Sequence, residues 1–483
     1  VLSTGNALPE ATLVGLGSRV PPPEIIDDDA VGSVEASGSF DHDADGIDFW
    51  ESLEAMRVKL IDPVVVGPRN GFGEFVVLAD AGSGATPRTA RGGIKVRAHD
   101  FNPERIMVDD LLMTTPSVNV GDAFAGPIEG VLDYAFGNFK IQPTSLPPTI
   151  AGGLLPEISG NTCAGMLTVA TFNVENLDAL DPQEKFDRLA AAIVNNLRSP
   201  LLVALEEVQD DNGPVNDSIV DATRTAARLI AAIQAAGGPA YQYRDIAPRR
   251  LQDGGEPGGN IRVGFLYRQD QGLVFINRPG GTAVNSVKAL KTPTGVRLNY
   301  SPGRIDPLNP AFADSRKPLV GEFLYEGRTV FVVANHFNSK GGDHPLFGRF
   351  QPPVRSSEVQ RNQQAQAVNA FVQSVLDKDP FARVIVLGDF NDFEFSDALT
   401  HLKGTALTNL MESLPENERY SYVFEGNSQS LDHILVSRTL AESPATWYDV
   451  VHMNAEFADQ VSDHEPQRAC FEKGPPNCPI SFP

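Results

Sequence analysis

The amino-acid sequence predicts two consecutive domains, an all-β domain followed by a larger α/β domain. Up to about residue 156, short apolar β-runs alternate with Gly, Pro and Asp, and no helical pattern interrupts them. After residue 160, apolar strands alternate with amphipathic helices. A length of 483 residues suits more than one domain, because a domain commonly takes roughly 100–200 residues. We therefore expect an all-β domain over 1–160 and an α/β domain over 161–483.

The strands of the first domain are expected at short apolar runs bounded by turn residues. These runs are residues 56–61, 73–78, 93–98 and 123–132. They predict a small barrel or sandwich, and an OB-like barrel is the form we expect. The Pro- and Gly-rich stretch 143–160 is the predicted linker to the second domain.

The second domain begins with a strand–helix–strand pattern. A β-run covers 167–172, and apolar residues at helical spacing from Phe186 to Leu197 predict a helix with one buried face. A buried strand is expected at 201–205. The further elements expected are a helix over 218–235, strands over 261–267 and 272–276, a hairpin over 317–335, a long helix over 357–376, and strands over 383–387 and 431–437.

Composition and charge exclude several classes of protein. The chain carries 39 Lys and Arg against 62 Asp and Glu, a formal net charge of −23. A broad basic face for polyanions is therefore excluded, and nucleic-acid binding would depend on metal cations or a local basic patch. No run of about 18 apolar residues occurs, so we expect no stable membrane insertion.

The three cysteines, Cys163, Cys470 and Cys478, are too few for a disulfide framework and too scattered for a thiolate zinc site. Cys470 and Cys478 flank a short loop and could form a terminal disulfide, with two free thiols as an equal alternative. The chain starts with Val rather than Met. We therefore expect a processed, secreted protein whose export signal has been removed.

Polar residues of a few types stand where the predicted strands of the second domain end. Such strand ends are where α/β folds build their sites. A single Asn or Asp after a strand is more often a turn or cap residue, but a repeated set is hard to explain in that way. The positions are Asn173, Glu206 and Glu207, Asn335 and His336, Asp389 and Asn391, Asp432 and His433, and Asp463 and His464.

These residue types indicate metal-assisted cleavage of phosphate esters. Carboxylate and amide oxygens are ligands for Mg²⁺, Mn²⁺ or Ca²⁺. Two histidines with carboxylates nearby could supply the base and the acid that hydrolysis needs. We expect Mg²⁺ or Mn²⁺ as the cofactor, with Ca²⁺ as a candidate structural ion.

The same residues lie in a series of motifs: TFNVENL, LVALEEVQD, IRVGFLYR, SRKPLV, NHFNSKGG, VLGDFND, LDHIL and SDHEP. Over about residues 166–471, this ordered set resembles the endonuclease/exonuclease/phosphatase superfamily, whose fold is that of deoxyribonuclease I. The preceding β domain together with DGGEPGGNIR and NHFNSKGG resembles bacterial extracellular nucleases of that superfamily. The resemblance implies a four-layer α/β sandwich and divalent-metal-dependent phosphodiester hydrolysis.

The resemblance also implies roles for single residues. Asn173, Glu207 and Asp463 match the metal site; Glu207 rather than Glu206 is chosen because the family has an acidic residue directly before Val. In the catalytic set, Asp389 and Asn391 match the pair that positions water and phosphate, His464 the general base, Asp432 the carboxylate that orients it, and His336 the second histidine.

The residues expected around the catalytic set are less specific. Glu256 is a weak candidate for the carboxylate partner of His336. Asn260 and Arg262 are candidate phosphate contacts, and Arg316 and Lys340 could add positive charge over the scissile phosphate. All four are therefore candidate substrate-binding residues.

An acidic segment of the first domain resembles half of a calcium-binding loop. Asp41, Asp43 and Asp45 stand at alternate positions, and Gly46 follows. The segment departs from the full motif, because Ser52 occupies the twelfth position. A solvated acidic loop is the alternative.

Three functions fit these observations. The first is a secreted nuclease that hydrolyses DNA, with RNA as a second substrate, at low sequence specificity. The second is a phosphomonoesterase or a sphingomyelinase-like lipid phosphodiesterase that uses the same site. The third, a binding protein on a degenerate scaffold, is disfavoured because every key side chain is present. Oligomeric state cannot be read from the sequence.

Overall fold

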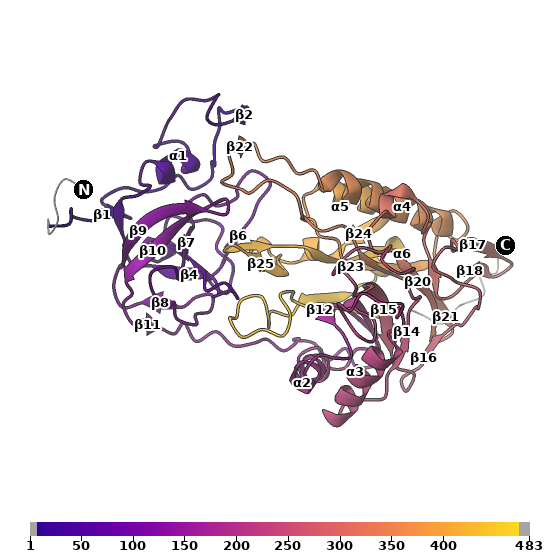
Figure 1. Cartoon of the computed structure of the whole chain (residues 1–483). Coiled ribbons are helices and arrows are strands. Elements are labelled where there is room, and N and C mark those ends of the chain that lie inside the picture. The colour runs from indigo at the N-terminus through magenta and orange to yellow at the C-terminus, as the bar shows by residue number, and fades with distance from the viewer. Residues whose placement is uncertain (1–6, 473–483) are drawn as a thin grey trace.

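The chain folds into a β-rich part and an α/β part that lie next to each other (Figure 1). The structure is a computed structural model, and it describes residues 7–472. In Figure 1 the β-rich part is indigo to purple, and the α/β part runs from magenta to yellow.

The N-terminal part is built on one nine-stranded sheet with the order β1-β3-β9-β10-β7-β5-β4-β8-β11. A short helix, α1 (Gly46–Glu51), and its Trp50 complete the core on one face. The strands are β1 (Thr12–Val14), β3 (Arg57–Leu60), β4 (Val64–Gly67), β5 (Phe75–Leu78), β7 (Ile106–Val108), β8 (Ala123–Phe124), β9 (Ile128–Ala135), β10 (Asn138–Ser145) and β11 (Thr149–Ile150). The all-β prediction is therefore confirmed. The OB-like form stays a prediction, because an OB-fold has five strands whereas this sheet has nine.

The α/β part contains two sheets that pack face to face. The first has the order β14-β15-β13-β12-β29-β28, and the second β16-β20-β21-β23-β27-β24 with β19 beside β20. The first sheet comprises β12 (Leu167–Leu177), β13 (Leu202–Val208), β14 (Gln242–Arg244), β15 (Arg262–Tyr267), β28 (Trp447–Val450) and β29 (Gln467–Phe471). The second comprises β16 (Leu273–Phe275), β19 (Gly303–Arg304), β20 (Leu319–Tyr325), β21 (Arg328–His336), β23 (Arg383–Asp389), β24 (Leu407–Asn409) and β27 (Asp432–Ser437).

Helices cover the outer faces of both sheets. α2 (Gln183–Ala191) and α3 (Thr223–Ala235) share a core with the first sheet. α4 (Glu358–Leu376) and α5 (Asp397–Lys403) pack on the second sheet. A separate core that includes Val169, Phe265 and Phe323 joins the inner faces of the two sheets. The order helix, sheet, sheet, helix confirms the four-layer α/β sandwich.

Short elements complete the described chain. They are β17 (Ala289–Thr292), β18 (Gly295–Leu298), α6 (Arg438–Ala441), a π-helical segment at Ala192–Asn196, and 3₁₀ helices at Asp80–Gly82, Pro310–Phe312, Leu410–Ser413 and Glu416–Glu418.

Strand pairs also connect the two parts of the chain. β2 (Gly32–Ser33) pairs with β22 (Phe350–Gln351), and β6 (Ile94–Lys95) pairs with β26 (Asn427–Gln429), which itself pairs with β25 (Tyr422–Phe424). The β-rich part therefore contacts loops that leave the carboxyl ends of the second sheet. The predicted domain boundary near residue 160 stays a prediction.

A disulfide links Cys163 to Cys470, with 6.1 Å between their Cα atoms. Both alternatives considered for Cys470, a bond to Cys478 and a free thiol, are therefore wrong, because its sulfur is bonded to Cys163. Cys478 itself lies outside the described residues. Sequence spacing favoured the nearby pair. In the fold, β12 runs antiparallel to β29 with Thr168 opposite Cys470, which brings the segment before β12 to that cysteine.

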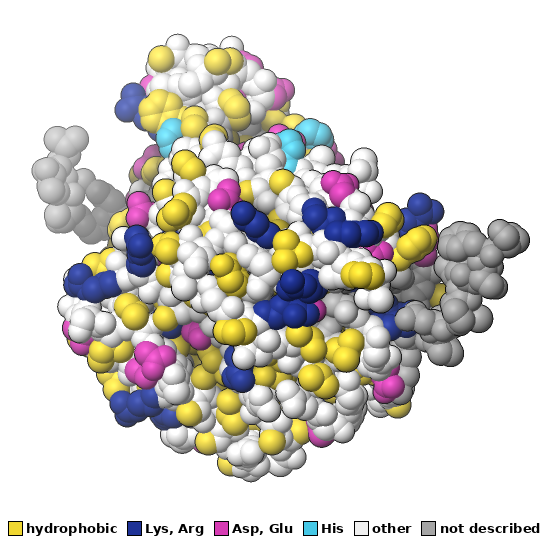
Figure 2. Space-filling model, turned by 90° about the vertical axis from the view of Figure 1, so that its right-hand side faces the viewer, with side chains coloured by type: hydrophobic (Ala, Val, Ile, Leu, Met, Phe, Trp, Pro, Cys, Tyr) yellow, Lys and Arg dark blue, Asp and Glu magenta, His cyan; other side chains and the backbone are white. Residues whose placement is uncertain are grey.

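The surface agrees with the charge analysis. On the face drawn in Figure 2, Lys and Arg side chains are interspersed with acidic and hydrophobic ones rather than gathered in one field. Within residues 7–472, no helix is both long enough and apolar enough to cross a membrane.

Candidate active site

The predicted site residues meet where strands of both sheets end. Asn173 lies in β12 and Glu207 in β13, while His336 and Asp389 end the parallel strands β21 and β23. His336 is opposite Asp389 in the register, and Asp389 is in turn opposite Asp432, the first residue of β27. Neighbouring strands thus place three of these side chains side by side.

Irregular pairing turns Glu207 toward the site. The ladder between β12 and β13 shifts register after Asn173, and the ladder between β13 and β15 shifts after Leu205. Glu207 has a φ of 60° within this bulge, and bulges commonly redirect a side chain beside an active site. Glu206 is instead fully buried and accepts a hydrogen bond from Thr171 at 2.8 Å. This geometry supports the choice of Glu207 over Glu206.

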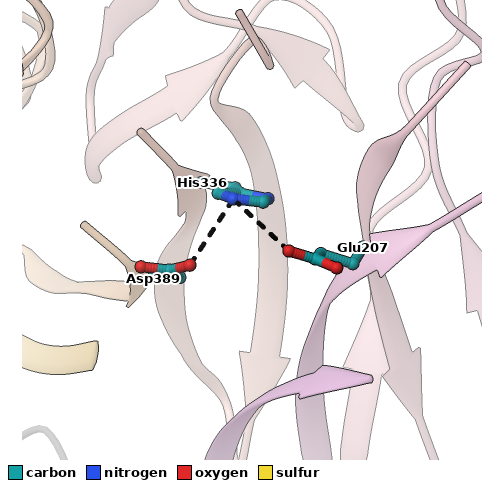
Figure 3. A group of neighbouring side chains, drawn as sticks. All are labelled: Glu207, His336 and Asp389. Atoms are coloured by element: carbon teal, nitrogen blue, oxygen red, sulfur yellow. Dashed lines mark ion pairs between the residues drawn. The ribbon is translucent and has the colours of Figure 1, made fainter. Parts of the chain in front are cut away.

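His336 faces two carboxylates from two different strands (Figure 3). Its Nε2 lies 3.4 Å from Asp389 Oδ2 and 3.9 Å from Glu207 Oε1. The Asn173 amide donates to both carboxylates, at 3.2 Å to Glu207 and 3.3 Å to Asp389. Asn173, Glu207, His336 and Asp389 therefore form one contact group.

His464 is held by Asp432. Its Nδ1 lies 2.7 Å from Asp432 Oδ2, and its Nε2 lies 3.8 Å from Asp389 Oδ2. The Ser421 hydroxyl donates to the same oxygen of Asp432 at 2.7 Å. The carboxylate thus fixes the ring so that Nε2 points at the shared Asp389.

Burial and neighbouring charges separate the two histidines electrostatically. Burial, with the charges of Arg316 and His464, lowers the pKa of His336 well below its usual value. Burial alone would also lower the pKa of His464, but the carboxylates of Asp432 and Asp389 raise it well above its usual value. Burial raises the pKa of Asp389 to about 7. Groups whose pKa values are pushed apart in one cavity are suited to acid–base chemistry.

Asn391 and two cations border the group. The Asn391 backbone N–H donates to Asp389 Oδ1 at 2.8 Å, and its side chain donates to Oδ2 at 3.2 Å. The Lys340 ammonium donates to the Asn391 carbonyl, and burial lowers its pKa to about 8. The Arg316 guanidinium is buried behind the group and donates to the Phe337 carbonyl.

Three candidates do not reach the group. Glu256 is exposed, and His336 instead faces Glu207 and Asp389, so the pairing of Glu256 with His336 is wrong. Asn260 is buried and donates to Asp210 at 2.7 Å, while buried Arg262 pairs with Asp245 at 3.2 Å. Because these polar atoms contact neighbouring residues of the protein, the prediction that Asn260 and Arg262 contact phosphate is wrong.

The predicted calcium loop is arranged differently from the sequence pattern. Asp41 and Asp43 are exposed, and Asp41 accepts hydrogen bonds from the backbone N–H groups of Asp43 and Ala44. Buried Asp45 is instead grouped with two other carboxylates, Asp27 and Asp29. Asp41 thus stabilises a turn before α1, and the alternating pattern of Asp41, Asp43 and Asp45 does not form a common set of ligands.

Two groups of side chains in the site could hold a metal ion. One ligand atom each from Glu207, His336 and Asp389 lie within 4.8 Å of one another, and so do atoms from Asp389, Asp432 and His464. Several carboxylates converge in a buried place, which a cation would stabilise. The donor set of oxygens and imidazole fits a hard divalent ion. The predicted ligand Asp463 belongs to neither group and lies at the mouth of the site, beside Tyr422.

Sequence reasoning missed two neighbours of the site. Glu175 lies near Asp463 and Glu207, and burial together with these charges raises its pKa to about 7. The ring of Tyr422 lies 4.8 Å from that of His464. Glu175 stands two residues after Asn173 in TFNVENL, so its position was visible, whereas nothing in the sequence places Tyr422 beside His464.

Two adjoining cavities border these residues. The catalytic cavity, of about 540 Å³, is lined by Glu207, His336, Asp389 and His464 and also by Phe136 of the β-rich part. A second cavity of about 940 Å³ lies between the two parts of the chain. Tyr422, Phe424 and Asp463 line both cavities.

The comparisons agree with this geometry. Residues 297–476 match the Endonuclease/Exonuclease/phosphatase family, and residues 13–151 match a family described as Domain of unknown function (DUF8508). No curated protein matches the chain. Residues 297–476 are therefore similar to the endonuclease/exonuclease/phosphatase family, which confirms the predicted resemblance and the prediction of a hydrolase.

Similar solved structures come from animals and bacteria. A humanized TDP2 of D. rerio is 17% identical, with 64% of this chain and 100% of that chain covered and a TM-score of 0.38. D. rerio TDP2 complexed with a single strand DNA product is 16% identical, with 64% and 99% covered and a TM-score of 0.39. An endonuclease/exonuclease/phosphatase from Bacteroides vulgatus is 15% identical, with 64% and 98% covered and a TM-score of 0.37.

Proposed function

We propose that the protein is a divalent-metal-dependent nuclease that hydrolyses phosphodiester bonds of DNA, with RNA as a second substrate. The observation that carries the proposal is the single buried group in which Glu207, His336, Asp389 and His464 converge from two sheets. It combines the carboxylates, the imidazoles and the cavity that phosphodiester hydrolysis requires.

In this proposal each side chain has a separate task. Asn173 and Asn391 hold the Asp389 carboxylate through the hydrogen bonds described above, so its oxygens are fixed before substrate binds. Asp432 orients His464, whose Nε2 can exchange a proton with water or with the departing oxygen. Lys340 places a positive charge at the cavity wall, where a phosphate oxygen would lie.

Glu207, His336 and Asp389 are the residues we propose to hold Mg²⁺ or Mn²⁺, with Asn173 next to them. When bound, such an ion polarises a phosphoryl oxygen and lowers the pKa of bound water. Ca²⁺ as an additional structural ion stays a proposal.

The first experiment is incubation of supercoiled plasmid with the protein in Mg²⁺, in Mn²⁺ with and without Ca²⁺, and in EDTA. We expect metal-dependent conversion to open-circular and linear DNA. Glu207→Gln should lower this rate by at least about a hundredfold, the loss that follows removal of a key electrostatic group.

Glu256→Gln is the matched control, since it makes the same chemical change at an exposed carboxylate of the same part of the chain. It should cleave at the normal rate. Equal loss in both variants, or cleavage that Glu207→Gln leaves unchanged, would contradict the proposed site.

A lipid phosphodiesterase is the second candidate function, and one observation favours it. Phe72 and Leu111 are 83% and 70% exposed and line the cavity next to the active site. Exposed apolar side chains beside a site can contact lipid. Plasmid that stays intact with every metal, with metal-dependent hydrolysis of sphingomyelin, would favour this candidate.

We also propose that the protein is secreted. The Cys163–Cys470 disulfide supports this, because such bonds persist mainly in oxidising compartments.

A further inference from the structure

The β-rich part contributes an aromatic side chain to the catalytic cavity. Strands β9 and β10 pair with Ala135 opposite Asn138, so Phe136 and Gly137 form a two-residue turn between them. Phe136 is 93% exposed and lines both the catalytic cavity and the adjoining one. A large apolar side chain is therefore presented to solvent at the entrance of the site.

The backbone shows that Phe136 is not the residue this turn would favour. Its φ is 53° and that of Gly137 is 79°, so both turn residues have positive φ, as in a type I′ hairpin turn. Asn or Asp is the usual first residue of such a turn, and a bulky residue with positive φ is an outlier. A strained residue in a cleft is grounds for a functional hypothesis.

The turn is held firmly against the α/β part. A Cβ atom on Gly137 would lie 2.4 Å from Pro345 Cβ, so the turn packs directly on that loop. Asn138 donates to Glu425 at 2.8 Å, and the Tyr134 hydroxyl donates to the Phe347 carbonyl at 2.8 Å. These contacts fix the backbone of the turn, and with it the Cα atom of Phe136, at the cavity entrance.

Strand β25 carries two further aromatic rings beside the catalytic group. From His464 the next ring is Tyr422, and the ring of Phe424 lies 6.4 Å further on at an angle of only 16° to that of Tyr422. Tyr422 and Phe424 are two positions apart in β25 and so share a face of the strand. Phe424 is 51% exposed and, like Phe136, lines both cavities.

Charge differs between the two cavities. The catalytic cavity has Lys340 and Arg355 in its wall, and the Arg355 guanidinium is held 4.5 Å over the ring of Phe101. In all, three Lys or Arg and five Asp or Glu residues line the catalytic cavity, whereas two Lys or Arg and seven Asp or Glu residues line the adjoining one. The cations of the catalytic cavity can contact phosphate oxygens, and the more acidic adjoining cavity favours an uncharged group.

We propose that Phe136, with Tyr422 and Phe424, stacks on unpaired bases next to the scissile phosphate, which makes single-stranded nucleic acid the preferred substrate. The proposal rests on the proposed nuclease function and assigns a role to the β-rich part. Stacking of this kind needs bases that are splayed out of a duplex, and it tolerates any base because each has an aromatic face.

The key variant is Phe136→Asn, which removes the ring but introduces the residue that the turn favours. Its thermal stability should equal or exceed that of the wild type, so a functional loss cannot be ascribed to misfolding. Phe136→Tyr keeps a ring. Phe381→Ala removes an aromatic side chain that is 79% exposed and lines neither of the two cavities, and it serves as the control.

The assay compares kcat/KM for a labelled single-stranded oligonucleotide, for the same sequence as a blunt duplex, and for an abasic oligonucleotide of the same length, which has no rings to stack. In Phe136→Asn we expect the ratio of single-strand to abasic-strand kcat/KM to fall about tenfold or more, mainly through KM, which is the size of effect that loss of one base stack produces. Phe136→Tyr and Phe381→Ala should retain the ratio.

Three results would overturn the proposal. One is an unchanged ratio in Phe136→Asn, and another is a wild-type preference for the duplex. The third is loss in Phe136→Asn of activity toward sphingomyelin in detergent micelles without loss toward single strands. Because the abasic strand is hydrolysed without any base stacking, its hydrolysis with an unchanged ratio would contradict only the base-stacking role. Absence of metal-dependent hydrolysis of every phosphodiester would contradict the nuclease function itself.

Discussion

At the scale of single residues, Asp389 is the point on which the active site converges. It accepts hydrogen bonds from Asn173 and from the backbone and side chain of Asn391, and both histidines lie within 4 Å of its Oδ2. Burial nevertheless raises its pKa to about 7. Burial of a carboxylate among so many partners costs stability, and the proposed role of Asp389 in holding a cation gives a functional reason for that cost.

Glu104 in the β-rich part is a buried carboxyl with no place in the active site, and it allows a test of pH dependence. It is 8% exposed, and burial raises its pKa from 4.5 to about 8. Between these two pH values the folded protein holds a proton that the unfolded chain releases, so this group lowers the stability progressively as pH rises. We expect Glu104→Gln to raise the melting temperature relative to wild type, by little at pH 5 and most at pH 8 and above.

The measurement is thermal unfolding of both proteins across this pH range. Glu24→Gln is the control, because Glu24 is an exposed carboxyl of the same part of the chain. A difference between Glu104→Gln and wild type that stays constant from pH 5 to pH 8 would show that Glu104 is not a buried, protonated group.

At the scale of elements, the closeness of β21 and β23 sets the distance between His336 and Asp389. Gly388 lies opposite Asn335 in this parallel pair, has a φ of 136°, and would place a Cβ atom 2.0 Å from the Asn335 carbonyl oxygen. We expect Gly388→Ala to separate the strand ends, lower the free energy of unfolding by about 2 kcal/mol or more, and reduce nuclease activity more than tenfold.

Gly160→Ala provides the comparison, since no atom lies within 4 Å of the Cβ position there. Chemical denaturation and plasmid cleavage would be measured on both variants. Normal stability and activity of Gly388→Ala would mean that the strand ends are not held as closely as the structure shows.

The contrast between predicted and observed site residues follows from what a sequence can encode. Asn173, His336 and Asp389 follow strongly apolar strands, so a pattern of strand ends was enough to bring them to one edge. Asn260 and Arg262 stand at the start of β15, which is antiparallel to β13 and therefore begins at the same edge, yet their side chains contact Asp210 and Asp245. Which polar atoms stay free depends on loop geometry that local periodicity does not specify.

Contacts between segments that are far apart in the chain could not be predicted from the sequence either. Phe136 and Phe139 are only three positions apart, yet Phe139 is buried in the core while Phe136 is exposed at the turn. Packing of the β-rich part against the α/β part decides that Phe136 enters the catalytic cavity, and neither segment alone carries that information.

At the scale of the whole molecule, ion pairs and one disulfide connect segments that are far apart in the sequence. Arg91 of the β-rich part pairs with Glu456 at 2.5 Å and with Glu157 at 2.9 Å, and Lys95 pairs with Glu394 at 2.6 Å. Glu456 is fully buried, and Lys95 is nearly so. Because separating such groups would leave charges buried and unpaired, the two parts are expected to hold one arrangement around the cavities.

The Cys163–Cys470 disulfide tests how strongly this arrangement depends on a covalent link. The bond joins the segment before β12 to β29, the last strand of the first sheet in the chain. The two cysteines are 307 residues apart in the sequence. Closing so long a loop restricts the unfolded chain, and removal of a native disulfide typically costs about 2–5 kcal/mol. We expect the Cys163→Ser/Cys470→Ser double variant to lose stability in that range but to keep nuclease activity at moderate temperature, because neither cysteine lines the catalytic cavity. Denaturant unfolding with and without reductant would measure the difference in stability. On reduction, the stability of the wild type should fall to that of the double variant. A wild type whose stability does not change with reductant would contradict the bond.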